Sequence, residues 1–166
     1  MNRKQFIHAG LLTGGAALLG CGTISAQAES TVFSAEQIDE FVSAAHGDFR
    51  RTKKILDENP LILNCASQLA KGDFETALGG ASHMGRRDIA DLLVEKGART
   101  DLFNLTFLGF NDFVKELVTR SPQYLRSYGP HGFTLLHHAK VGKHVDLANW
   151  LQGRGLEEDL IEVFAS

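Results

Sequence analysis

The sequence predicts an all-α fold in which about four helix-turn-helix units stack as a solenoid. A glycine-containing turn after a short helix recurs at Gly47, Gly85, Gly109 and near Gly142. Each turn precedes a short amphipathic helix, and the unit repeats at about 33 residues. Units of this length bury their apolar faces against their neighbours, so a stack of repeats is the expected architecture.

The first 28 residues have the features of an export signal. Arg3 and Lys4 form a basic start, a moderately apolar stretch follows over residues 7–24, and residues 26–28 match a small-x-small cleavage site. The start is similar to a twin-arginine signal with one arginine replaced by Lys4, so twin-arginine and general secretory export both stay open. We therefore expect an exported protein of the periplasm or cell envelope.

Cys21 offers an alternative to cleavage after residue 28. The run Leu-Leu-Gly-Cys that ends at Cys21 resembles a lipobox with an untypical leucine before the glycine. If it acts as one, Cys21 becomes the acylated N-terminus of a lipoprotein and the only membrane contact. Cys65 is the single cysteine after the signal, so no internal disulfide is expected.

Charge and composition argue against a nucleic-acid partner. The chain carries 17 Lys and Arg against 20 Asp and Glu, a formal net charge of −3. Its basic residues are scattered, and the short cluster at residues 50–54 has the spacing of a solvated helix face. The residues after the signal suffice for one modest domain.

The domain is expected to begin with a lead segment over residues 29–37, followed by repeats over residues 38–156. The first repeat runs from Phe41 through a turn at Gly47 to an outer helix that ends at Asn59-Pro60. Its opening departs from the other units, as expected of an N-terminal capping repeat.

The second unit, residues 76–98, has the clearest pattern. Thr76 is predicted to cap the inner helix, and Gly85 to end it in the left-handed conformation. Ala81 is small, as a close approach between neighbouring helices requires. The outer helix carries one apolar stripe at i, i+3 and i+4: Ile89, Leu92 and Leu93.

The remaining units vary this pattern. Between Gly85 and Gly109 there are too few residues for a finger and a full inner helix, so residues 101–108 are expected to enter their helix directly. The fourth unit recovers a glycine-rich turn at residues 129–132 and a Thr-x-Leu-His opening at residues 134–137. Residues 157–166 are expected to form an acidic C-terminal capping helix.

Residues 76–98 resemble an ankyrin repeat over their full length, and the fourth unit is similar in its opening. Both openings lack the family's proline and have Ala77 and Leu135 instead. The resemblance covers about residues 36–156 and implies a scaffold that binds another protein, with no catalytic residue and no cofactor. It also implies that His137 is a structural histidine hydrogen-bonded near the Thr134 cap.

The same resemblance places recognition on the finger tips and inner helices. The implied partner-binding residues are Phe74, Gly80, His83, Met84, Asn104, Phe107, His131, Phe133 and His138. Exposed aromatic side chains at such positions act as anchors of an interface. Phe49, Phe110 and Phe113, on or beside outer helices, are expected in the core.

The histidines of the fourth unit raise the alternative of a small exported metal-binding protein or hydrolase. They are His131, His137, His138 and His144. Because no cysteine or carboxylate at ligand spacing accompanies them, no metal site and no enzyme activity are predicted. A lipoprotein-tethered structural component of the envelope is a third alternative.

Overall fold

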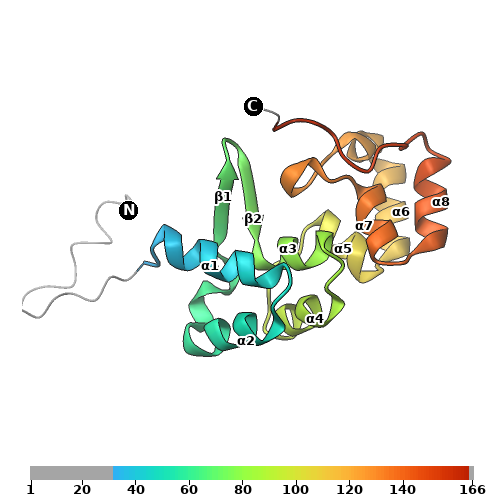
Figure 1. Cartoon of the computed structure of the whole chain (residues 1–166). Helices are drawn as coiled ribbons and strands as arrows, with labels where there is room; N and C mark the ends of the chain where they lie inside the picture. The colour runs from blue at the N-terminus through green and yellow to red at the C-terminus, as the bar shows by residue number, and fades with distance from the viewer. Residues whose placement is uncertain (1–31, 165–166) are drawn as a thin grey trace, which may run out of the picture. The chain divides into compact units, whose positions relative to one another are not determined.

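The computed structural model describes residues 32–164, which lie within one compact and mostly helical unit. The helices pack as consecutive pairs, and α1, α3, α5 and α7 contact one another in that order (Figure 1). The α-helices are α1 (Ala35–Ala45), α2 (Phe49–Glu58), α3 (Ala77–His83), α4 (Arg87–Glu95), α5 (Leu102–Leu108), α6 (Asn111–Arg120), α7 (Leu135–Val141) and α8 (Val145–Gln152). Short 3-10 helices are η1 (Pro60–Asn64), η2 (Pro122–Arg126) and η3 (Pro130–Gly132).

The predicted all-α solenoid is wrong, because the chain also forms an antiparallel hairpin of β1 (Ala66–Ala70) and β2 (Asp73–Thr76) (Figure 1). Gly72, at φ 86°, makes the tight turn between the strands. Along β2, Asp73 and Glu75 are buried whereas Phe74 between them is exposed. This period of two belongs to a strand and does not fit the all-α fold that the sequence predicted.

The apolar core also differs from one continuous stack, since the described residues bury their side chains in two clusters. The first includes Phe41, Leu78, Ile89 and Phe107 and spans α1 to α5. The second lies among α6, α7 and α8 and includes Val114, Leu136, Leu147 and Leu151.

Local features of the second unit are confirmed. The Thr76 hydroxyl accepts a hydrogen bond from the Gly79 N–H at 3.1 Å, Ala81 is fully buried, and Gly85 has φ 68°. In the fourth unit, where the glycine comes one position early, Gly142 keeps a right-handed conformation and Lys143 takes φ 62°.

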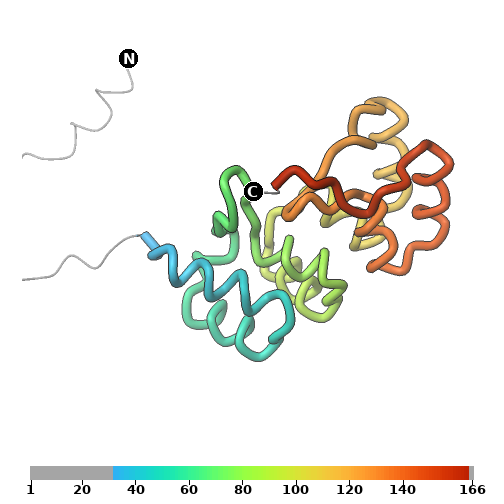
Figure 2. The backbone as a smooth tube through the Cα atoms, turned by 45° about the horizontal axis from the view of Figure 1, so that its top comes forward, coloured from blue at the N-terminus to red at the C-terminus, as the bar shows by residue number. Residues whose placement is uncertain are grey.

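The predicted capping helix over residues 157–166 is wrong for the residues that the structure describes, up to 164. This segment is extended and lies along residues 132–134, so it runs back toward the hairpin (Figure 2). Leu160 forms an isolated bridge with Phe133, and the Thr134 N–H donates to the Asp159 carbonyl at 2.9 Å. Backbone pairing with the turn thus replaces the expected helical hydrogen bonds.

Several side chains of the fourth unit also differ from expectation. The Thr134 hydroxyl donates to the Glu158 carbonyl at 2.6 Å and does not cap α7. His138, not His137, bonds the Thr134 carbonyl, at 2.8 Å. Phe110 and Phe113 are half exposed, because they lie on the solvent side of α6. The lead segment is shorter than predicted, since α1 begins at Ala35 behind a Ser34 cap.

The predicted export signal, the cleavage site and Cys21 lie outside the described residues. Between residues 32 and 164, no helix combines the length and the apolar character that a membrane span needs.

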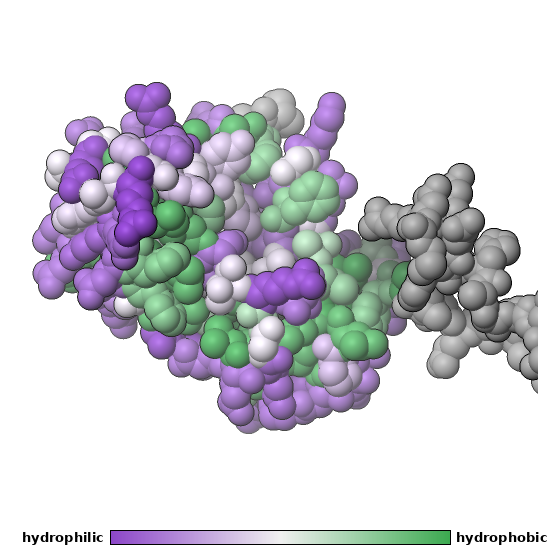
Figure 3. All heavy atoms as spheres, turned by 180° about the vertical axis from the view of Figure 1, so that it is seen from behind, coloured by the Kyte–Doolittle hydropathy of each residue, from purple (hydrophilic) through white to green (hydrophobic). Residues whose placement is uncertain are grey.

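Apolar side chains gather in the middle of the rear face, bordered by hydrophilic ones (Figure 3).

Candidate metal centre

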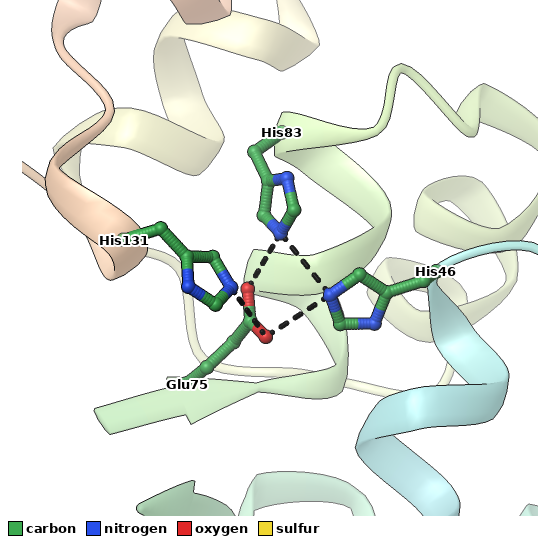
Figure 4. Close-up of side chains that lie close together, drawn as sticks. All are labelled: His46, Glu75, His83 and His131. Atoms are coloured by element: carbon green, nitrogen blue, oxygen red, sulfur yellow. Dashed lines mark hydrogen bonds and ion pairs between the residues drawn. The ribbon is translucent and has the colours of Figure 1, made fainter. Parts of the chain in front are cut away.

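Three histidines and one glutamate from four different segments converge on one point (Figure 4). His46 follows the last residue of α1, Glu75 lies on β2, and His83 ends α3. His131 lies in the turn before α7. The hairpin register turns Glu75 inward, and the contact between α1 and α3 brings His46 and His83 together.

The facing atoms are the Nε2 atoms of the histidines and the two carboxylate oxygens. His83 Nε2 lies 2.8 Å from Glu75 Oε1, and His46 Nε2 lies 3.2 Å from Glu75 Oε2. The Nε2 atoms of His46 and His83 are 3.2 Å apart, and His131 Nε2 is 3.6 Å from Glu75 Oε2. One ligand atom from each residue lies within 4.8 Å of all the others.

These separations are close to those between the ligands of a tetrahedral ion. Zinc bonds to imidazole nitrogen and carboxylate oxygen at about 2.0–2.1 Å, so adjacent ligand atoms should lie about 3.3–3.4 Å apart. Three of the six separations in the set that includes Glu75 Oε2 are within a few tenths of an ångström of that value. The ligand atoms of the group lie within 4.8 Å of one another, so an ion at the centre requires the more distant ligands to move inward.

The outward-facing nitrogens of His46 and His131 have partners that leave the inner ones free to bind an ion, whereas His83 Nδ1 is buried with no hydrogen-bond partner among the described residues. His46 Nδ1 lies 2.9 Å from the Val42 carbonyl, which can only accept, so this nitrogen carries the hydrogen. His131 Nδ1 lies 3.4 Å from the Asp73 carboxylate. Carbonyl and carboxylate partners of this kind orient metal-binding histidines in proteins. In a neutral imidazole held this way, Nε2 presents a lone pair to the centre.

Burial makes a central positive charge necessary. The Glu75 side chain is fully buried, and neither carboxylate oxygen has a hydrogen bond of good angle despite the short contacts. Burial would raise the pKa of Glu75, but the imidazoles of His46 and His83 lower it to about 2. The contact with Glu75 in turn raises the pKa of His46. An ionised carboxylate buried among lone pairs is costly without a proton or metal ion between them.

Two glycines of α3 make room for the cluster. A Cβ on Gly80 would lie 2.8 Å from the His46 ring, and one on Gly79 would lie 3.3 Å from the Glu75 side chain. Gly80, expected to face a partner, is buried and instead gives the imidazole its place. Glycine in a helix costs about 1 kcal/mol relative to alanine, so this close approach is maintained at a loss in helix stability.

His131 is held in a conformation that few side chains adopt. Its φ is 58° and its ψ 5°, in the left-handed region, where a residue other than glycine is under strain. The Asp73 carboxylate accepts the His131 backbone N–H at 3.1 Å and fixes the turn. This backbone conformation places the imidazole beside the Glu75 carboxylate.

The structure separates the nine predicted partner-binding residues into different groups. Phe74 and Met84 are exposed, and Phe133 is half-buried. His83 and His131 belong to the metal centre. The prediction of surface contact is wrong for Gly80, Asn104, Phe107 and His138, which are all buried in the interior.

The four histidines of the fourth unit do not form a site together. Only His131 belongs to the centre. His137 bonds the His83 carbonyl at 2.8 Å, His138 bonds Thr134, and His144 bonds the Phe107 carbonyl at 2.8 Å. These three histidines therefore have structural roles.

Sequence reasoning missed His46 and Glu75, which lie far from His131 in the chain. One usable signal was the run Asp73-Phe74-Glu75, where two acids alternate with an apolar residue directly before a capped helix. In a half-buried strand this pattern turns either the acids or the phenylalanine inward.

No protein-family model matches the chain, and no curated protein matches it either.

Proposed function

We propose that the protein binds one divalent transition-metal ion, with zinc as the best fit, through His46, Glu75, His83 and His131. The observation that carries this proposal is the convergence of three Nε2 atoms and a fully buried carboxylate, with one ligand atom from each residue within 4.8 Å of all the others. Imidazole and carboxylate ligands without thiolate suit zinc and its neighbours in the first transition row.

The ligand set favours a structural role for the ion. Four protein ligands fill a tetrahedral zinc site and leave no open position, as in structural rather than catalytic centres. The ion would connect α1, the hairpin, α3 and the turn before α7. Because it binds only the folded chain, it stabilises the fold by an amount that grows with metal concentration.

Metal titration of the chelator-treated full chain tests this proposal. We expect one Zn²⁺ per chain, measured by competition with a chromophoric chelator. The Co²⁺-loaded protein should show the intense visible absorption of a tetrahedral site. His83→Ala and Glu75→Gln should each weaken binding at least about 10-fold to 100-fold, a loss known even from removing partners of ligands.

His144→Gln serves as the matched control, because it changes a histidine that bonds Phe107 away from the centre. It should leave metal affinity unchanged. Equal affinity in the wild type, His83→Ala and Glu75→Gln, or the absence of stoichiometric binding, would refute the metal centre. The variants are compared only after circular dichroism shows that they are folded.

A second candidate function, protein binding, is supported by exposed apolar side chains beside the hairpin. Leu69, Phe74 and Met84 are about half exposed. The resemblance of residues 76–98 to an ankyrin repeat supports the same function, although fold analogy alone identifies no partner. A partner captured by crosslinking should be lost with Phe74→Ala and retained with Lys115→Ala.

We also propose that the protein is exported, because residues 1–28 have the sequence pattern of an export signal. A chain that begins at Glu29 should stay in the cytoplasm, and Cys21→Ala should release a lipidated form from membranes. Finding the shortened chain outside the cytoplasm would refute the assignment.

A further inference from the structure

A second candidate binding site lies beside the metal centre. An open cavity of about 240 Å³ lies between the hairpin, the start of α5, the turn before α7 and the C-terminal segment. Its walls include four aromatic rings and two carboxylates: Phe74, Phe103, Tyr128, Phe164, Asp73 and Asp101. None of the four metal-centre residues lines it.

The rings come from four separate segments that the fold brings together. Tyr128 and Phe164 are in edge contact, with ring centroids 5.8 Å apart. Phe103 packs on the backbone of Gly129, where a Cβ would lie 3.1 Å from its ring. Phe74 is 59% exposed on β2, so one wall is open to solvent.

The charge of the cavity is negative. Among its lining residues are two aspartates and no lysine, arginine or histidine. Asp73 is buried and accepts the His131 backbone N–H. The Asp101 residue is exposed overall, but its carboxyl caps α5 through the Asn104 N–H at 2.8 Å, and burial raises the pKa of this carboxyl. A carboxylate keeps accepting capacity beyond one such bond.

Aromatic walls with nearby carboxylates select a particular class of ligand. Aromatic faces attract a cation, and they do so most effectively when the cation sheds water easily, as quaternary ammonium groups do. A strongly hydrated ammonium or a metal ion would gain less from these rings. We propose that this cavity binds a small organic cation with a trimethylammonium group.

The test uses choline and its uncharged isostere, 3,3-dimethyl-1-butanol, titrated into the full chain at constant ionic strength. Heteronuclear NMR or calorimetry should show saturable binding of choline and of tetramethylammonium, and none of the isostere at equal concentration. Equal binding of choline and the isostere would show an apolar cavity without charge selection and overturn the proposal.

Two variants locate the site. Asp101→Asn removes a charge but preserves the helix cap, since asparagine caps as well as aspartate. Phe74→Leu preserves apolar bulk but removes a ring face. Each should weaken choline binding about threefold or more. Phe113→Leu, at an exposed ring on α6, is the matched control and should have no effect. Unchanged affinity in both Asp101→Asn and Phe74→Leu would overturn the site.

A trimethylammonium group can belong to a free small molecule or to a trimethyllysine side chain of a protein, and a peptide bearing trimethyllysine distinguishes these two sources. The proposal commits to a free small cation, so choline should compete the peptide away at the same site. A peptide that binds without competition from choline counts against it. All titrations are repeated with a metal chelator, where choline binding should persist, so the two sites succeed or fail independently.

Discussion

Replacing His131 by glycine or by alanine separates its two properties, backbone strain and metal binding. Both substitutions remove the imidazole 3.6 Å from Glu75, but only glycine occupies φ 58° without cost. A left-handed conformation costs a residue with a Cβ about 1–2 kcal/mol. In metal-free protein, His131→Gly should therefore be about 1 kcal/mol more stable than His131→Ala.

Added zinc should separate the wild type from both variants. At a zinc concentration 100 times the wild-type dissociation constant, binding stabilises the wild type by about 2.7 kcal/mol. If loss of a ligand raises that constant about 100-fold, the same zinc stabilises either variant by only about 0.4 kcal/mol. Metal should therefore benefit the wild type far more than the variants.

Urea denaturation with chelator and with zinc gives the free energy of unfolding of each protein in both conditions. Zinc stabilisation of His131→Gly equal to that of the wild type would show that His131 does not bind the ion. Equal stability of the glycine and alanine variants without metal would show that the turn carries no strain at this residue.

Three further predictions concern burial and packing. Burial lowers the pKa of His138 to about 4. As the pH falls, this histidine therefore takes up its proton in the unfolded chain before it does so in the folded one. The free energy of unfolding should drop by about 3 kcal/mol between pH 6.5 and 4. Urea denaturation of His138→Leu across this pH range should lack this drop. Parallel pH dependences of the wild type and His138→Leu would contradict the prediction. Gly80→Ala places a Cβ 2.8 Å from the His46 ring and should weaken zinc binding although it favours the helix; unchanged affinity in the chelator competition would argue against the proposed position of His46. Ala81→Leu overpacks a fully buried position and should lower the free energy of unfolding by about 1–3 kcal/mol. An unchanged urea midpoint would mean that the α1–α3 contact accommodates the larger side chain.

The sequence by itself determined the local structure, because local rules need only neighbours in the chain. The Thr76 cap, the left-handed Gly85 and the direct entry of residues 102–108 into a helix could all be read from short patterns. Repeats of helix followed by helix were also visible in the spacing of apolar residues.

These local rules could not predict the hairpin or the conformation of the C-terminal segment, because both depend on pairing with other segments. A four-residue strand such as β2 depends on its partner for hydrogen bonds, and its alternation of acids with phenylalanine places the charged side chains inside. Buried carboxylates need partners from other segments. Glu75 faces the imidazoles of His46 and His83, and Asp73 accepts the His131 backbone N–H. Residues 156–164 have the apolar spacing of a helix, but pairing with residues 132–134 decides their conformation.

Only the tertiary structure decided which histidines act together. In the sequence, His131 stands with His137, His138 and His144, and proximity in the chain suggested that group. Packing of α1 on α3 and the strained turn before α7 instead bring His131 to His46, Glu75 and His83. Metal ligands must meet at one point in space, and a stack of helix pairs makes neighbours of residues separated by 85 positions, such as His46 and His131.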